Sequence, residues 1–138
     1  MESVNSIKSN EKLSNLMNQI NETCNALISA LEVNAKSVGE YGWWVAHQIN
    51  TEYIDILIKN ILKIKYHLLR LEKELKNGFI SSEEELKYII WWLLDTTDTI
   101  NTICANDGYL RNQFSFATDE IKDLITKMLN EINISIAA

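Results

Sequence analysis

The residues of this chain with the clearest chemical potential are acidic pairs spaced one helical turn apart. Glu52 and Asp55 form one pair, and Asp95 and Asp98 form another. Residues three apart lie on one face of a helix, so the two carboxylates of a pair could hold a divalent cation together. A cation held in this way activates water or polarises a phosphate oxygen. The pairs therefore suggest one functional class, a metal-dependent hydrolase.

Spacing and ligand chemistry give this class little support. Counted from the predicted turn between their helices, Asp55 and Asp95 differ in height by about 12 Å, which is too far for one shared metal ion. Neither histidine follows a glutamate at the three-residue spacing of di-iron bundles, and the two cysteines form no CxxC motif. We therefore expect no metal site, no cofactor and no catalytic residue. The enzyme alternative is a small metal-dependent all-α nucleotide hydrolase using Asp95, Asp98 and nearby acidic residues.

Composition and charge limit the binding partners and the cellular location that we expect. The net charge is −6 and the isoelectric point is about 4.9, which disfavours a nucleic-acid-binding surface. The most apolar window, residues 43–62, carries charged side chains that are costly in a membrane, and the N-terminus has no apolar signal region. We expect a cytoplasmic protein that binds neither nucleic acid nor membrane. Abundant isoleucine, asparagine and lysine indicate an AT-rich genome, that of a bacterium, an archaeon or one of their viruses or mobile elements.

The fold class follows from periodicity and from the shortage of turn residues. The 138 residues include no proline and only four glycines, which argues against an all-β fold. Apolar residues recur every three or four positions along nearly the whole chain, as in amphipathic helices. The pattern predicts helices over approximately 10–38, 43–76, 83–105 and 109–135. Because short turns join antiparallel neighbours, we expect residues 1–138 to form a single domain, an all-α up-down-up-down four-helix bundle.

Polar residues occupy a few positions where this pattern calls for apolar ones. They are Asn34, His47, Asn50 and Thr97, with Asp98 beside the last. Their positions along the helix axes, counted from the predicted turns, place them toward one end of the bundle. They are the candidate polar core or ligand site. A ligand site is one interpretation, and polar residues that fix helix register are the other, as a core asparagine does in coiled coils.

Large apolar residues also lie outside the predicted interior. The predicted interface consists of Trp91, Trp92, Tyr88, Val45, Ile49 and Ile56. Tryptophan and tyrosine are enriched at the energetic centres of protein interfaces, and large apolar patches rarely stay exposed on monomers. The sequence therefore favours a non-catalytic interaction or assembly protein that dimerises or docks on another protein. The opposing interpretation is that the helical register is shifted by one residue, which would place the tryptophans in the core.

Overall fold

The computed structural model describes residues 11–41, 51–76 and 83–137, and this part of the chain is entirely helical. The four helices are α2 (Glu11–Tyr41), α4 (Thr51–Lys76), α5 (Glu83–Asn106) and α6 (Gly108–Ala137). Their bounds agree with the predicted ranges to within a few residues, except that 43–50 of the second range lie outside the described residues. The predicted all-α class is confirmed.

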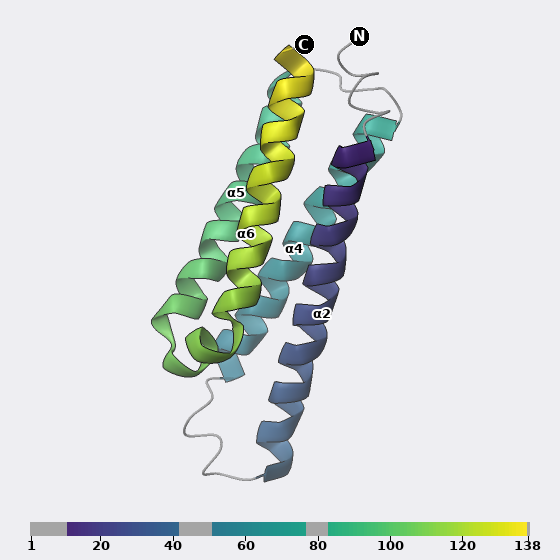
Figure 1. Ribbon diagram of the computed structural model, residues 1–138. Coiled ribbons are helices and arrows are strands. Elements are labelled where there is room, and N and C mark those ends of the chain that lie inside the picture. The colour runs from purple at the N-terminus through teal and green to yellow at the C-terminus, as the bar shows by residue number, and fades with distance from the viewer. Residues whose placement is uncertain (1–10, 42–50, 77–82, 138) are drawn as a thin grey trace.

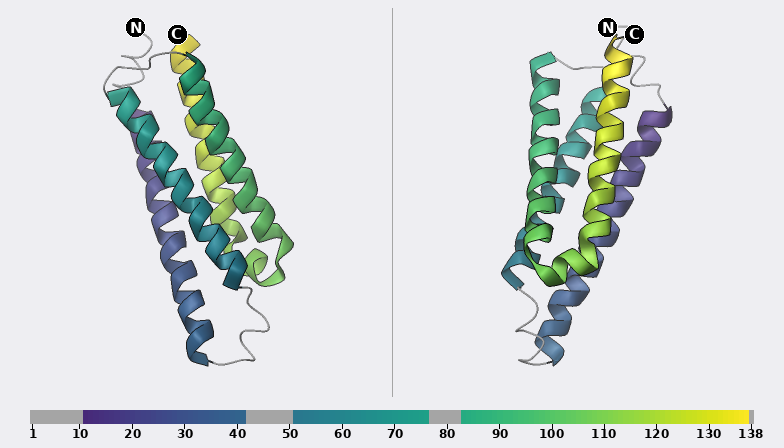
Figure 2. Two further views of the ribbon diagram at one scale, coloured as in Figure 1. Left: turned by 180° about the vertical axis from the view of Figure 1, so that it is seen from behind. Right: turned by 60° about the vertical axis from the view of Figure 1, so that its left-hand side comes forward.

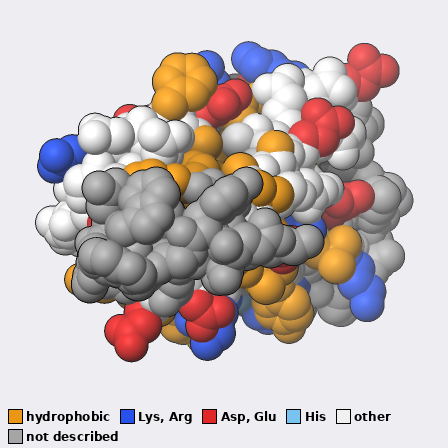
Figure 3. All heavy atoms as spheres, turned by 90° about the horizontal axis from the view of Figure 1, so that it is seen from below, with side chains coloured by type: hydrophobic (Ala, Val, Ile, Leu, Met, Phe, Trp, Pro, Cys, Tyr) orange, Lys and Arg blue, Asp and Glu red, His pale blue; other side chains and the backbone are white. Residues whose placement is uncertain are grey.

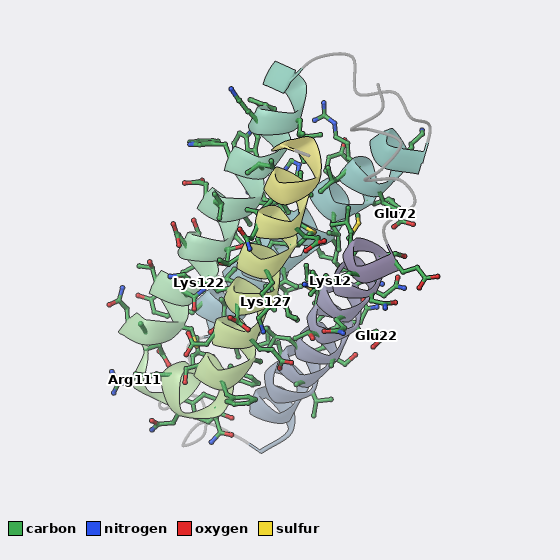
Figure 4. The ribbon with its side chains drawn as sticks, turned by 45° about the horizontal axis from the view of Figure 1, so that its top comes forward. Lys12, Glu22, Glu72, Arg111, Lys122 and Lys127 are labelled. Carbon is green, nitrogen blue, oxygen red and sulfur yellow. The ribbon has the colours of Figure 1, made fainter. Side chains whose placement is uncertain are left out.

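Each helix contacts two others, so that the four enclose a common interior (Figure 1). α2 packs against α4 and α6, and α5 packs against the same two helices. Lys12 on α2 lies 3.5 Å from the carboxylate of Glu131 on α6. Figure 4 shows Lys122 of α6 on the side toward α5, where its amine lies 3.9 Å from a carboxylate oxygen of Asp98. In both views of Figure 2 the Tyr41 end of α2 reaches beyond the corner between α5 and α6.

The interior is apolar and follows the predicted periodicity. Every helix turns one stripe of leucine, isoleucine, methionine or cysteine inward, and the burial of this stripe is the main stabilising contribution to the fold. The members with no exposed surface are Ile20, Cys24, Leu31, Leu57, Ile61, Ile64, Leu71, Leu93, Ile100, Leu110, Ile121, Ile125, Met128 and Ile132.

Two adjacent isoleucines of α5 contribute to the interior. Ile89 is buried, with 1% of its surface exposed, and Ile90 is partly buried and packs against the core. A helix with two packed neighbours buries a stripe wider than a single seam, so adjacent residues can both contact the interior. The two tryptophans that follow stay outside this stripe.

A one-residue corner joins α5 to α6. Asp107 is the single residue between Asn106 and Gly108, and its Oδ1 accepts a hydrogen bond of 2.9 Å from the backbone N–H of Leu110. This geometry makes Asp107 the N-cap of α6. The thiol of Cys104 donates to the carbonyl of Leu110 at 3.1 Å and ties the end of α5 to the first turn of α6.

Replacing the capping carboxylate should destabilise the fold by a measurable amount. Asp107→Ala removes the acceptor for the Leu110 N–H, and a lost N-cap costs about 1 kcal/mol of unfolding free energy. Asp107→Asn keeps an oxygen acceptor and is the matched control, with a loss of only a few tenths. Chemical denaturation measures both variants. Equal losses in the two would show that the side chain does not cap α6.

Candidate functional site

Five rings gather where α4 faces α5. His67 of α4 stacks on Trp92 of α5, with ring centroids 5.9 Å apart and planes inclined by 14°. Tyr66 meets the edge of His67 at 5.4 Å. Tyr88 and Trp91 meet Trp92 at 6.0 Å and 5.2 Å, both in edge-to-face geometry. Such pairs are favoured beyond the area they bury. We call these five residues the aromatic cluster.

The aromatic cluster has two inner rings and three outer ones. Trp92 and His67 are partly buried. The outer rings remain largely in solvent, with exposed fractions of 64% for Tyr66, 53% for Tyr88 and 55% for Trp91. Leu69 on the same helix as Tyr66, and Leu94 on the same helix as Trp91, are exposed as well.

Apolar side chains also show among charged ones at the end of the bundle where α5 meets α6 (Figure 3). The aromatic cluster is nevertheless the one place among the described residues where ring contacts link two helices.

The surroundings of His67 favour its neutral form. Burial lowers the pKa of its imidazole, and the positive charges of Arg70 and Lys63 lower that pKa further. Its Nδ1 is buried and has no hydrogen-bond partner among the described residues. A neutral ring without such a partner serves here as an apolar surface for Trp92. Lys63 and Arg70 lie about one turn on either side of His67 and give the α4 edge of the aromatic cluster a charged rim.

The predicted interface residues are placed unevenly. Tyr88 and Trp91 are exposed and Trp92 is half-buried, while Val45 and Ile49 lie outside the described residues. Ile56 is 41% exposed, but it lies eleven residues before His67 on α4, about 16 Å along the helix from the level of Trp92. Ile56 is therefore well separated from Trp91 and Trp92 along the bundle. That the remaining residues form an interface stays a prediction.

Tyr66 and His67 were not predicted to belong to this surface, because the pattern within one helix does not show which residues of the next helix lie beside it. The connection between α4 and α5 is a shared reference. His67 lies nine residues before the end of α4 at Lys76, and Trp92 lies nine residues after the start of α5 at Glu83. Counting from that connection would have paired them.

The predicted polar site does not assemble among the described residues. Thr97 is buried, and its hydroxyl donates to the carbonyl of Leu93 at 2.6 Å. Asp98 points the other way, with 70% of its side chain exposed. The Asn34 side chain, His47 and Asn50 lie outside the described part of the chain. Because its hydroxyl is bonded within its own helix, Thr97 is satisfied without any ligand.

Acidic and sulfur-bearing residues are scattered over the molecule. Asp55 pairs with Lys59 at 3.0 Å on the surface of α4, and Asp95 is exposed on α5. In the described ranges no group of three or more histidine, cysteine or acidic residues is arranged to hold a metal ion. Cys24 and Cys104 are free and buried, and burial raises the pKa of the Cys24 thiol to about 12. A thiol with so high a pKa is a poor nucleophile at neutral pH.

The comparisons with known proteins give no family. No protein-family model matches the chain, and neither a curated protein nor a solved structure is significantly similar to it. Across the described helices, none combines the length and apolar character that a membrane span requires. The arrangement of side chains on the four helices is therefore the ground for a functional assignment.

Acidification should weaken the fold through His67. Its pKa in the folded protein lies below the value near 6.5 of the unfolded chain, so the unfolded chain takes up the proton first as the pH falls. The contribution of this residue is thus fully present above pH 6.5 and is lost below it. His67→Gln cannot be protonated in this range. We expect its melting temperature to fall less than that of the wild type between pH 7.5 and pH 5.5. Equal decreases in the two proteins would contradict this role of His67.

Proposed function

We propose that this chain is a non-catalytic helical protein that binds a partner protein through the aromatic cluster. The single observation that carries the proposal is the exposure of three rings over two partly buried ones, held jointly by α4 and α5. Tryptophan and tyrosine dominate the energetic centres of interfaces because they bury large rigid surfaces at low entropic cost. A contiguous apolar surface of this kind is unusual on a monomer that binds nothing.

The aromatic cluster also has the layout of an interface. Trp92 and His67 form a partly buried centre, and Trp91, Tyr88 and Tyr66 lie around it with more than half of their surface exposed. Charged side chains at the α4 edge supply a polar rim, as specific interfaces require. Two packed helices hold the rings, so little conformational entropy remains to be lost on binding.

An up-down-up-down antiparallel bundle is part of the proposal. The contact of Lys12 with Glu131 supports it for α2 and α6, because a residue near the start of one helix meets a residue near the end of the other. The stacking of His67 on Trp92 gives similar support for α4 and α5. Short connections between consecutive helices favour the same topology. We also propose a cytoplasmic location, which the two free cysteines support.

The hydrolase alternative has no comparable support. Asp95 and Asp98 would be the metal ligands of such an enzyme, and both are exposed on α5. The carboxylate of Asp98 lies 3.9 Å from the amine of Lys122. Shared metal binding needs oxygens that converge within about 2.1 Å of one point. We therefore do not propose a catalytic role.

Affinity capture from the native host tests the proposal. The bait is the full chain as wild type, Trp91→Ser and Phe116→Ser. Phe116 is an exposed aromatic residue on α6, so its variant is a matched control for the loss of a surface ring elsewhere. Truncating a central interface ring weakens binding about 30-fold or more. We expect quantitative mass spectrometry to find a protein retained by the wild type and Phe116→Ser and depleted with Trp91→Ser. A wild type that retains no protein specifically, or a Trp91→Ser variant that retains as much, would contradict the proposal.

A further inference from the structure

A second heptad pattern runs along α4, in addition to the stripe that this helix buries. Lys59, Leu62, Tyr66, Leu69 and Lys73 follow one another at steps of three, four, three and four residues. Such steps align side chains along one side of a helix, as at the a and d positions of a coiled coil. We call these five residues the outer seam. It covers two heptads, or about 21 Å of helix.

The apolar members of the outer seam are exposed. The exposed fractions are 49% for Leu62, 64% for Tyr66 and 65% for Leu69. The interior of the bundle uses other positions of α4, among them Ile61 and Ile64. In the left view of Figure 2 no described helix passes in front of α4. Because a helix with apolar residues on two sides packs on two sides, the outer seam fits a further helix.

Cations flank the outer seam on the side toward α5. Lys63 and Arg70 directly follow Leu62 and Leu69, so they hold the e positions of the heptads. After burial, the charges of Arg70 and Lys63 are the causes that lower the pKa of His67, which stacks on α5. Lys63 is exposed and forms no ion pair with any described residue. In coiled coils, charges at e positions pair with opposite charges on the neighbouring helix, so this flank fits carboxylates.

α4 itself has no carboxylate along most of this surface. Residues 56–71 include four lysines and arginines and none of the 19 acidic residues of the chain. At the borders of this stretch, Asp55 pairs with Lys59 at 3.0 Å, and Glu72 is half-buried. On α5, Asp95 is exposed and forms no ion pair with Lys63. The whole chain carries a net charge of −6, so this face of α4 differs in sign from the rest and attracts acidic partners.

A second copy of the chain does not match this charge pattern. In an antiparallel pair of α4 helices the e positions face each other, so Lys63 and Arg70 would meet cations. In a parallel pair the e position faces the g position, where Arg70 would meet Lys65. Like charges in contact are unfavourable in an interface. A nucleic-acid backbone offers phosphates but no apolar side chains for the two leucines. The pattern therefore fits a different protein that is both acidic and apolar.

We propose that the outer seam binds an acidic amphipathic helix of the partner protein, packed along α4 as in a two-stranded coiled coil. Apolar side chains of that helix cover Leu62, Tyr66 and Leu69, and its carboxylates lie beside Lys63 and Arg70. The proposal rests on the proposed function, because Tyr66 belongs to both surfaces, and it names the chemistry of the partner.

Selection from a display library of helical peptides tests this chemistry. The peptides are three heptads long, with seam and flanking positions randomised, and the target is the full chain. We expect the selected peptides to carry leucine or isoleucine at the seam and aspartate or glutamate beside it. Lys63→Glu with Arg70→Glu should weaken their binding about tenfold or more, because each exposed pair contributes a factor of about 1.5 to 5 and reversal adds repulsion. Lys122→Glu with Lys127→Glu makes the same charge change on α6 and should leave the affinity within about twofold.

Three results of these measurements would overturn the proposal. The first is a set of selected peptides that is neutral or basic beside the seam, or a library with no binder that the α4 reversal weakens. The second is wild-type binding to vesicles of phosphatidylcholine and phosphatidylserine that the same reversal abolishes, which would assign the face to a membrane. The third is a dimer in light scattering that Leu69→Ser dissociates, which would assign the outer seam to a second copy.

Capture from the native host separates this proposal from the proposed function. Leu69→Ser is added to the baits, with Val33→Ser on α2 as the matched control, because their exposed fractions are 65% and 64%. We expect one protein to be depleted with Trp91→Ser and with Leu69→Ser and to be retained by Val33→Ser. Depletion with Trp91→Ser alone would overturn the outer seam and leave the proposed function intact. Depletion with neither variant would overturn both.

Discussion

The burial of one apolar stripe from each of four helices is the constraint on which the rest of this molecule depends. Residues such as Ile61, Leu93 and Ile125 are fully inside, whereas Trp91 is exposed and Trp92 is only partly buried. A helix in such a bundle can turn only part of its circumference inward. Any large ring outside that part must be covered by something else or stay in water. Among the described residues, the three outer rings of the aromatic cluster and Phe116 are in that position.

The exposed aromatic side chains lie on different helices of the bundle. The aromatic cluster brings Tyr66 of α4 together with Tyr88 and Trp91 of α5, whereas Phe116 is a single exposed ring on α6. Several rings held by two packed helices offer a larger rigid surface than one isolated ring, and large aromatic surfaces dominate the energetic centres of interfaces.

Much of the fold could be predicted from the sequence, and the surfaces only in part. Periodicity located the helices, and Asn106-Asp107-Gly108 marked the corner before α6. The off-stripe positions of Tyr88 and Trp91 predicted their exposure. The pairing of His67 with Trp92 depends on where two helices meet, which no pattern within either helix records. A groove between α2 and α6 is less predictable still, because the alanines that line it, Ala26, Ala30 and Ala117, come from helices about ninety residues apart in the sequence. Likewise, the spacing that marked Thr97 as a polar core residue did not reveal its bond to Leu93.

The most direct test of this account compares two neighbouring residues on α5 by the free energy of unfolding. Trp91→Ser removes a ring that is 55% exposed, whereas Leu93→Ala leaves a cavity at a fully buried position. Chemical denaturation should give a loss below about 1 kcal/mol for the tryptophan variant, and about 2–5 kcal/mol for the leucine variant. A loss for Trp91→Ser as large as that for Leu93→Ala would show that the ring belongs to the core, and would contradict the assignment of the aromatic cluster as a binding surface.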